Sequence, residues 1–273
     1  MKNRFVRKVT AIAAGFGLWH GVGTAALTTN TIFEQNFDSD TVGQLPSGWT
    51  GLPTVNNNAF VTNNVSQSAP NSLAIQITDS TLWTVAKSFP AVDLANGDPD
   101  NRLSYSLDIN VDHIDHNNAE GINLRLFNGV SQIEAGMPRI LRFNSLWSLY
   151  NGDVSINGGN AYNGPLGGFF NFNQWYNFRV VISPTSPTSG TADWYVDGSL
   201  INTETYSGRS TSQTHNMNEF DIYYLNSDVN AGTGALMYFD NLVIQSIVPE
   251  PSSVALLVVG GLILWRRRNT AAE

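Results

Sequence analysis

The stretch that decides the fold is Leu103–Val111, which reads LSYSLDINV. Its apolar residues recur at every second position, while serine, aspartate and asparagine occupy the positions between them. Successive side chains of a strand point to opposite faces of its sheet. This alternation therefore predicts a β-strand with one face in an apolar core and the other face polar.

Runs of the same kind occur along the rest of the body, separated by segments rich in Asn, Gly, Ser and Thr. The further strands that this pattern predicts are Leu73–Ile77, Gly121–Phe127, Ile140–Tyr150, Trp175–Ser183, Ala192–Val196, Leu200–Tyr206, Glu219–Leu225 and Leu236–Gln245. Asp197-Gly198 lies between two of them and predicts a tight hairpin. Many short strands with turn signals between them predict an all-β sandwich or barrel, and the lack of a fixed repeat argues against a propeller.

Three groups of short motifs bracket nearly the whole body. They are FEQNFD at 33–38 with LPSGW at 45–49, WYNFRVVI at 175–182 with WYVDG at 194–198, and YFDNLVI at 238–244. Together they resemble the concanavalin A-like and laminin G-like jelly rolls. The resemblance implies a single jelly-roll-like antiparallel β-sandwich over residues 27–247, in which the first and last strands are neighbours. That fold carries lectins, adhesion modules, glycosidases and lyases, so it does not by itself decide a function.

The first 26 residues have the pattern of a secretory signal peptide. Lys and Arg are the only charged residues at positions 2–8, an apolar run follows at Val9–Leu18, and small residues come after it. A basic segment, a short apolar segment and a small-residue cleavage site are the three parts of such a peptide. We therefore predict export, with cleavage after Ala25 or Ala26.

The end of the chain also has three parts. A Val-Pro-Glu-Pro segment begins at Val248, a wholly apolar run covers Val254–Trp265, and three arginines follow. As a helix, this apolar run spans about 18 Å, which is short of the bilayer core of about 30 Å. Ser252 and Ser253 can lengthen the helix, and the arginines fit a cytoplasmic flank.

The order of these parts resembles the PEP-CTERM sorting signal of Gram-negative bacteria, here over residues 248–273 with a short transmembrane helix at 252–265. The resemblance implies Sec export and a transient stay in the inner membrane. An exosortase, a cysteine transpeptidase, would then transfer the body to the cell surface or the extracellular matrix. An ordinary C-terminal anchor is the alternative. The sorting residues would be Pro249, Glu250, Pro251, Arg266, Arg267 and Arg268.

Charge is divided unevenly between the ends and the body. The chain has 14 Lys and Arg, 22 Asp and Glu, and a formal net charge of −8. Half of the basic residues but only two acidic ones lie in the two end segments, which leaves a body of net charge −13. Such a surface repels phosphate backbones and argues against nucleic-acid partners. The chain has no cysteine, which excludes disulfides, zinc–thiolate sites and cysteine nucleophiles.

One polar segment, DINVDHIDH at 108–116, combines Asp108, Asp112 and Asp115 with His113 and His116. Imidazole and carboxylate are ligands of zinc and calcium. A polar strand end followed by a solvated loop explains the same residues and is the interpretation that we favour, because the two histidines share a side only if the chain turns.

Glycosidases usually work with two carboxylates placed across a concave face. The Glu-x-Asp-x-x-Glu run of jelly-roll glycosidases is missing from this chain. Its glutamates, Glu219 among them, stand singly, so no catalytic residue is assigned.

A structural calcium ion is a further candidate. Many concanavalin-like jelly rolls hold calcium between their chain ends, and carboxylates are its preferred ligands. If the first and last strands pair here, the resemblance implies that Glu34, Asp38 and Asp240 are the ligands.

Aromatic residues are plentiful, and most of them are expected to fill the core of a sandwich. Three of them lie close to loops rich in Asn and Gly and are the candidate contacts for a sugar ligand. They are Trp147, Tyr150 and Tyr162.

Three functions fit these observations. The first is an exported, non-enzymatic surface or matrix protein, associated with exopolysaccharide or biofilm, that binds extracellular carbohydrate. The second is a secreted glycan-active enzyme, a glycosidase or a lyase, whose site the sequence does not reveal. The third is a purely structural surface protein. The missing catalytic run favours the first, and the face of the sandwich decides among them.

Overall fold

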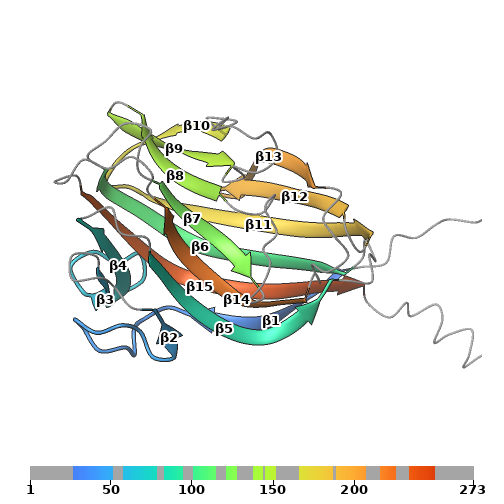
Figure 1. Ribbon diagram of the computed structural model, residues 1–273, viewed down its shortest axis with the longest axis horizontal. Helices are drawn as coiled ribbons and strands as arrows, with labels where there is room; N and C mark the ends of the chain where they lie inside the picture. The colour runs from blue at the N-terminus through green and yellow to red at the C-terminus, as the bar shows by residue number, and fades with distance from the viewer. Residues whose placement is uncertain are drawn as a thin grey trace, which may run out of the picture. The chain divides into compact units, whose positions relative to one another are not determined.

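Two antiparallel β-sheets pack face to face (Figure 1). The structure is a computed structural model of the 273-residue chain, and it describes residues 27–51, 58–78, 83–94, 101–114, 121–127, 138–143, 145–151, 166–186, 189–206, 216–225 and 234–249. The predicted signal peptide and the sorting tail beyond Pro249 lie outside these residues. No helix in the described part is long and apolar enough to span a membrane.

Sheet A has eight strands in the order β13-β12-β11-β6-β15-β4-β3, with β1 added beside β15. They are β1 (Leu27–Gln35), β3 (Asn58–Thr62), β4 (Ser72–Ile77), β6 (Arg102–Ile114), β11 (Trp175–Ser186), β12 (Ser189–Val196), β13 (Ser199–Tyr206) and β15 (Ala235–Pro249). The strand β4 pairs with the first part of β15, and β1 pairs with its last part. The first and last strands of the body are therefore neighbours, as predicted, and Leu27 lies opposite Pro249.

Sheet B has seven strands in the order β10-β9-β8-β7-β14-β5-β2. They are β2 (Trp49–Thr50), β5 (Trp83–Asp93), β7 (Gly121–Phe127), β8 (Pro138–Phe143), β9 (Leu146–Asn151), β10 (Leu166–Phe170) and β14 (Asn216–Leu225). The strands β7 and β14 lie side by side at its centre, and both carry alternating apolar residues toward sheet A.

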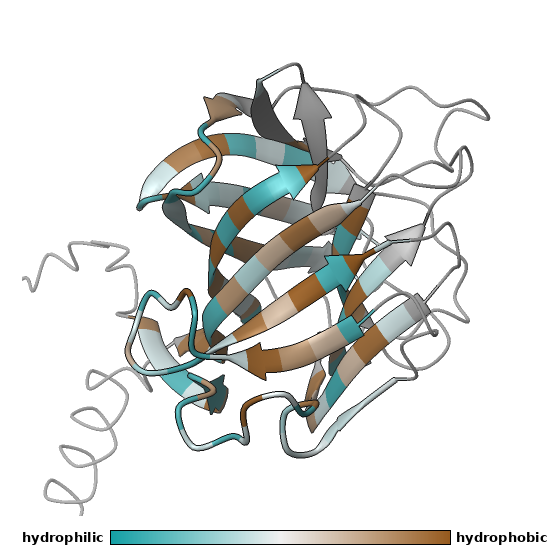
Figure 2. Ribbon diagram, turned by 90° about the vertical axis from the view of Figure 1, so that its left-hand side faces the viewer, coloured by the Kyte–Doolittle hydropathy of each residue, from teal (hydrophilic) through white to brown (hydrophobic). Residues whose placement is uncertain are grey.

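The core lies between the two sheets. Leu103, Tyr105, Leu107, Ile109 and Val111 are all buried, which confirms the face predicted for this strand. The rings of Tyr105 in sheet A and Phe220 in sheet B have centroids 5.5 Å apart, so side chains of the two sheets meet directly. Figure 2 shows why one face of each sheet enters the core, since apolar and polar residues alternate along many of the strands. Each large apolar side chain buried in this way contributes about 1.5–3 kcal/mol to stability.

Most predicted strands are present, with one correction. The run Ile140–Tyr150, predicted as one strand, is a hairpin in which β8 and β9 pair and Phe143 lies opposite Leu146. The periodicity continues across the turn and therefore conceals it. Five strands were not predicted: β1, β2, β3, β5 and β10. They are short or interrupted by polar residues, and β5 contains Lys87 and Pro90.

The predicted hairpin at Asp197-Gly198 is confirmed. It joins β12 to β13, and both residues have positive φ, at 49° and 77°. Gly51, just after β2, has a φ of 131°, and a Cβ there would lie 2.3 Å from the carbonyl oxygen of Thr84. Only glycine allows β2 to approach β5 so closely.

Candidate functional site: the polar face of sheet B

The outward face of sheet B carries a group of polar side chains on its two central strands. Because β7 and β14 bury every second residue in the core, the residues between them face away from sheet A. We call these five residues the sheet-B polar face: Asn123 and Arg125 on β7, and Glu219, Asp221 and Tyr223 on β14.

An arginine–aspartate pair lies at the middle of this face. The strand register places Asp221 opposite Arg125. The Nε of Arg125 donates to Oδ1 of Asp221 at 2.7 Å, and Nη2 donates to Oδ2 at 2.5 Å. The same guanidinium lies 3.8 Å from the ring centroid of Tyr223. The carboxylate, the cation and the ring therefore form one stacked unit with a bidentate ion pair.

This pair is withdrawn from water although it faces away from the core. The side chain of Asp221 is 1% exposed and that of Arg125 is 12% exposed. Outward polar residues of a sheet are normally solvated, and a buried charge persists only when it is paired. Burial raises the pKa of Asp221, and the hydrogen bonds and charge of Arg125 offset part of that rise.

Glu219 lies two residues before Asp221 on the same face of β14. Burial raises the pKa of Glu219, the negative charge of Asp221 raises it further, and Arg125 offsets part of the rise. The expectation that Glu219 stands alone is therefore wrong, because it is electrostatically coupled to both charged neighbours. Clusters of residues with shifted pKa values occur at functional sites, and structural ion pairs also produce them.

Asn123 completes the face. Its side chain is 3% exposed, and its Oδ1 is buried without a hydrogen-bond partner. An unpaired buried acceptor costs about 1–3 kcal/mol, and few are found in native proteins. The register places Asn123 opposite Tyr223 on one side and Arg139 on the other.

The predicted sugar contacts fall into different places. Tyr150 is in the same cross-strand row as Asn123, because it lies opposite Arg139, although its side chain is outside the described part. Trp147 lies opposite Phe170 of β10. Tyr162 is outside the described residues. Their role stays a prediction.

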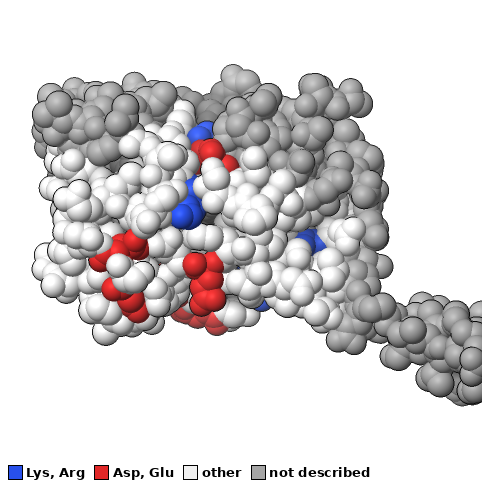
Figure 3. Space-filling view, turned by 90° about the horizontal axis from the view of Figure 1, so that it is seen from below, with Lys and Arg blue, Asp and Glu red and all other residues white. Residues whose placement is uncertain are grey.

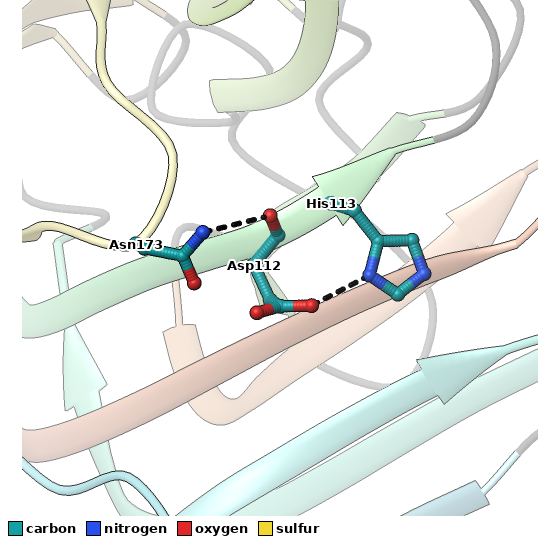
Figure 4. A network of polar contacts seen from close by, with 3 residues as sticks. All are labelled: Asp112, His113 and Asn173. Carbon is teal, nitrogen blue, oxygen red and sulfur yellow. Dashed lines mark hydrogen bonds and ion pairs between the residues drawn. The ribbon is translucent and has the colours of Figure 1, made fainter.

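The described part of the polar segment, residues 108–114, has two environments, and Asp115 and His116 lie outside the described residues. The side chain of Asp108 is buried on the outward face of sheet A and accepts hydrogen bonds from Asn177 and Asn241, both at 2.8 Å. At the end of β6, a carboxylate oxygen of Asp112 lies 2.7 Å from Nδ1 of His113, and Asn173 donates to the Asp112 carbonyl (Figure 4). Both side chains of the Asp112–His113 pair are partly exposed, which fits a polar strand end.

The three candidate calcium ligands do not gather in the described residues, which contain no group of three acidic or histidine side chains suited to a metal. Glu34 is exposed on β1, and Asp38 accepts hydrogen bonds from Asn36 and Asn71. The buried carboxylate of Asp240 accepts from both backbone and hydroxyl donors of the Gln67–Ser68 segment and from the Asn241 amide. Calcium binding stays a prediction, and the melting temperature after chelation tests it.

Charged residues are few on the side of the molecule in Figure 3, where most described residues carry no charge and the acidic ones form a few small groups. This side suits uncharged ligands better than polyanions.

The comparisons with known proteins concern the fold. No protein-family model matches the sequence, and no curated protein matches it. Among solved structures, the carbohydrate esterase of the Shiga toxin-encoding bacteriophage phi24B is similar, at 10% identity and a TM-score of 0.54, over 82% of this chain and 100% of that one.

Two polysaccharide lyases are also similar. The endo-β-1,4-glucuronan lyase of the fungus Trichoderma reesei has 11% identity and a TM-score of 0.53, over 79% of this chain and 95% of that one. A double mutant of alginate lyase Aly36B, in complex with an alginate trisaccharide, has 11% identity and a TM-score of 0.53, over 78% and 97%. The described part of the chain is thus a concanavalin A-like jelly-roll sandwich, as the motifs implied.

Sequence reasoning missed the polar face itself. Periodicity in the two strands does place Asn123 with Arg125, and Glu219 with Asp221 and Tyr223, on common faces. It cannot show that these strands pair, because they are far apart in the chain. That pairing is what brings Arg125 to Asp221.

Proposed function

We propose that this exported sandwich is a carbohydrate-active enzyme whose site is the sheet-B polar face. The observation that carries the proposal is the ion pair of Arg125 with Asp221, which is withdrawn from water on the outward side of two central strands, with the half-buried Glu219 on the same face. The fold supports the same class, because the similar structures include proteins named as a carbohydrate esterase and polysaccharide lyases.

The carboxyl group of Glu219 suits acid chemistry. Glu219 and Asp221 are two residues apart on one strand, so they share a face and their Cα atoms are about 6.8 Å apart. Glu219, with its raised pKa, retains a proton closer to neutral pH and can donate it to a glycosidic oxygen. Asp221 stays the counter-ion of Arg125 and holds that guanidinium in place.

This proposal changes the balance between the expectations from sequence. The sequence favours a non-enzymatic carbohydrate-binding protein because it contains no recognisable catalytic group, and the polar face is the candidate that supports an enzyme instead. Sorting to the cell surface by an exosortase, contact with extracellular polysaccharide and a calcium ion between the chain ends stay part of the proposal as expectations.

The test is a polysaccharide panel with the purified protein. New reducing ends report glycosidic cleavage, and ultraviolet absorbance of unsaturated products distinguishes elimination from hydrolysis. We expect turnover of at least one polysaccharide and a loss of about 10²-fold or more in kcat/KM for Glu219→Gln, the usual size of a lost acid–base group. The matched control is Asp193→Asn, which alters a carboxylate on sheet A that accepts from the Thr203 hydroxyl and should leave turnover unchanged.

The other outcomes are equally informative. Binding of a polysaccharide without cleavage favours the non-enzymatic binder. Neither binding nor cleavage across the panel favours a purely structural surface protein and contradicts the proposal.

A further inference from the structure

We propose that the sugar unit bound against Glu219 carries hydroxyl groups and no carboxylate, so that the domain prefers neutral polysaccharides to uronate polysaccharides. This inference rests on the proposed function and names the substrate class of the same site. It differs from the substrates in the names of the two similar lyases, which are glucuronan and alginate.

The first argument is the charge balance at the acidic end of the face. Glu219 and Asp221 are both hydrogen-bond acceptors when ionised, and Arg125 is their only described cationic neighbour. Two donors of that guanidinium are already used by Asp221. A sugar carboxylate bound here would therefore lie beside the ionised carboxylate of Glu219. The described residues offer no cation besides Arg125, which already pairs with Asp221, to neutralise it.

The second argument is the unmet acceptor of Asn123. Its Oδ1 is buried without a partner on the same face and two residues from Arg125. A hydroxyl group can donate to that oxygen, whereas an ionised carboxylate cannot, because it carries no proton. Asn123 lies one strand across and four residues along from Glu219, so it would meet a neighbouring sugar unit of the same chain. The described acceptors thus match a ligand that is rich in donors, which is the chemistry of a neutral polysaccharide.

The strand register places the backbone of Arg139 opposite Asn123, at the other end of the face from Glu219. The body's net charge of −13 adds long-range repulsion of polyanions.

The experiment measures affinity of the full chain for two kinds of probe. Neutral β-glucan, galactan, mannan and xylan form one set, and alginate and glucuronan form the other, each in affinity electrophoresis and by calorimetry. We expect binding to a member of the neutral set and weak binding to both uronates. Glu219→Gln should raise uronate affinity by up to about ten-fold, as expected when one charge about 6 Å away is removed at an intermediate dielectric, and the gain should grow as pH rises and the wild-type carboxyl loses its proton. Asp193→Asn, on sheet A, should leave uronate affinity unchanged.

Wild-type protein gives an independent readout if the variant does not fold. If repulsion limits uronate binding, added NaCl should strengthen it, whereas binding through arginine should weaken with salt. Preference for alginate or glucuronan with such weakening overturns this inference and leaves the proposed function standing. Failure to bind any member of either set overturns both.

Discussion

Replacing Arg125 by methionine is the change that bears most directly on the polar face. The variant Arg125→Met keeps a long apolar side chain but leaves the carboxylate of Asp221, 1% exposed, without its bidentate partner. Breaking a buried ion pair from one side typically costs about 3–5 kcal/mol. Loss of the contact with Tyr223 adds about 0.5–1 kcal/mol.

The assays are urea unfolding and thermal unfolding, both followed by tryptophan fluorescence. The two losses add to about 3.5–6 kcal/mol. For a body of this size, 1 kcal/mol shifts the melting temperature by about 2–4 °C, so we expect a fall of about 7–24 °C. The control is Arg179→Met, which alters an exposed arginine stacked on Tyr195 at 4.4 Å and should cost less than about 1 kcal/mol.

A double variant separates the effect of removing the whole ion pair from the effect of leaving one charge unpaired. Arg125→Met combined with Asp221→Leu removes both charges, and similar apolar replacements of buried ion pairs are often neutral or stabilising. The double variant should therefore recover most of the loss. In the single variant, the pKa of Asp221 rises further, so unfolding free energy should increase as pH falls. A single variant within 1 kcal/mol of wild type, or a double variant as unstable as the single, would refute the reasoning.

Three more predictions concern stability. Gly51→Ala should cost about 3 kcal/mol in urea unfolding because its Cβ meets backbone, whereas Gly43→Ala, with open space around it, should cost about 1; equal costs would contradict the clash. Asp240→Ala should cost about 3 kcal/mol because the partly buried amides of Gln67 and Ser68 lose their acceptor, against less than about 1 kcal/mol for Asp193→Ala, which accepts from the Thr203 hydroxyl; similar losses would show that the Asp240 contacts add little stability. The pKa of Glu219 in the folded protein is raised above its ordinary 4.5, so the free energy of unfolding of the wild type should rise as pH falls through the folded pKa toward 4.5. Glu219→Gln should reduce that slope. Identical profiles of the urea midpoint against pH for the two proteins would contradict the raised pKa.

The fold could be predicted from sequence where periodicity is clean. The alternation in Leu103–Val111 and the Asp197-Gly198 turn are local properties, and both are confirmed. The strand β5 could not be predicted, because Lys87 occupies a core-parity position. In the folded protein, the Nζ of Lys87 lies over the Phe33 ring and donates to the Ser47 carbonyl. Both partners are distant in sequence, so the β5 segment alone does not reveal them.

The site could be predicted only in part. Local alternation is sufficient to place Asn123 with Arg125, but not to set them beside β14, which lies about 100 residues further along the chain. The Asp–His segment at the end of β6 is recognisable in the sequence because its residues are adjacent. The candidate face is instead assembled from single residues of distant strands, which is a property of register rather than of motif.

The central claim is that carbohydrate binds to the sheet-B polar face. The most direct measurement is chemical-shift mapping on isotope-labelled protein, titrated with an oligosaccharide of the polysaccharide that binds best. The side-chain amide of Asn123 would be assigned from an Asn123→Ser variant. The account predicts saturable shifts at Asn123, Arg125 and Tyr223, with the outward face of sheet A around Asn177 unchanged. Shifts confined to sheet A, or none at any concentration, would contradict it.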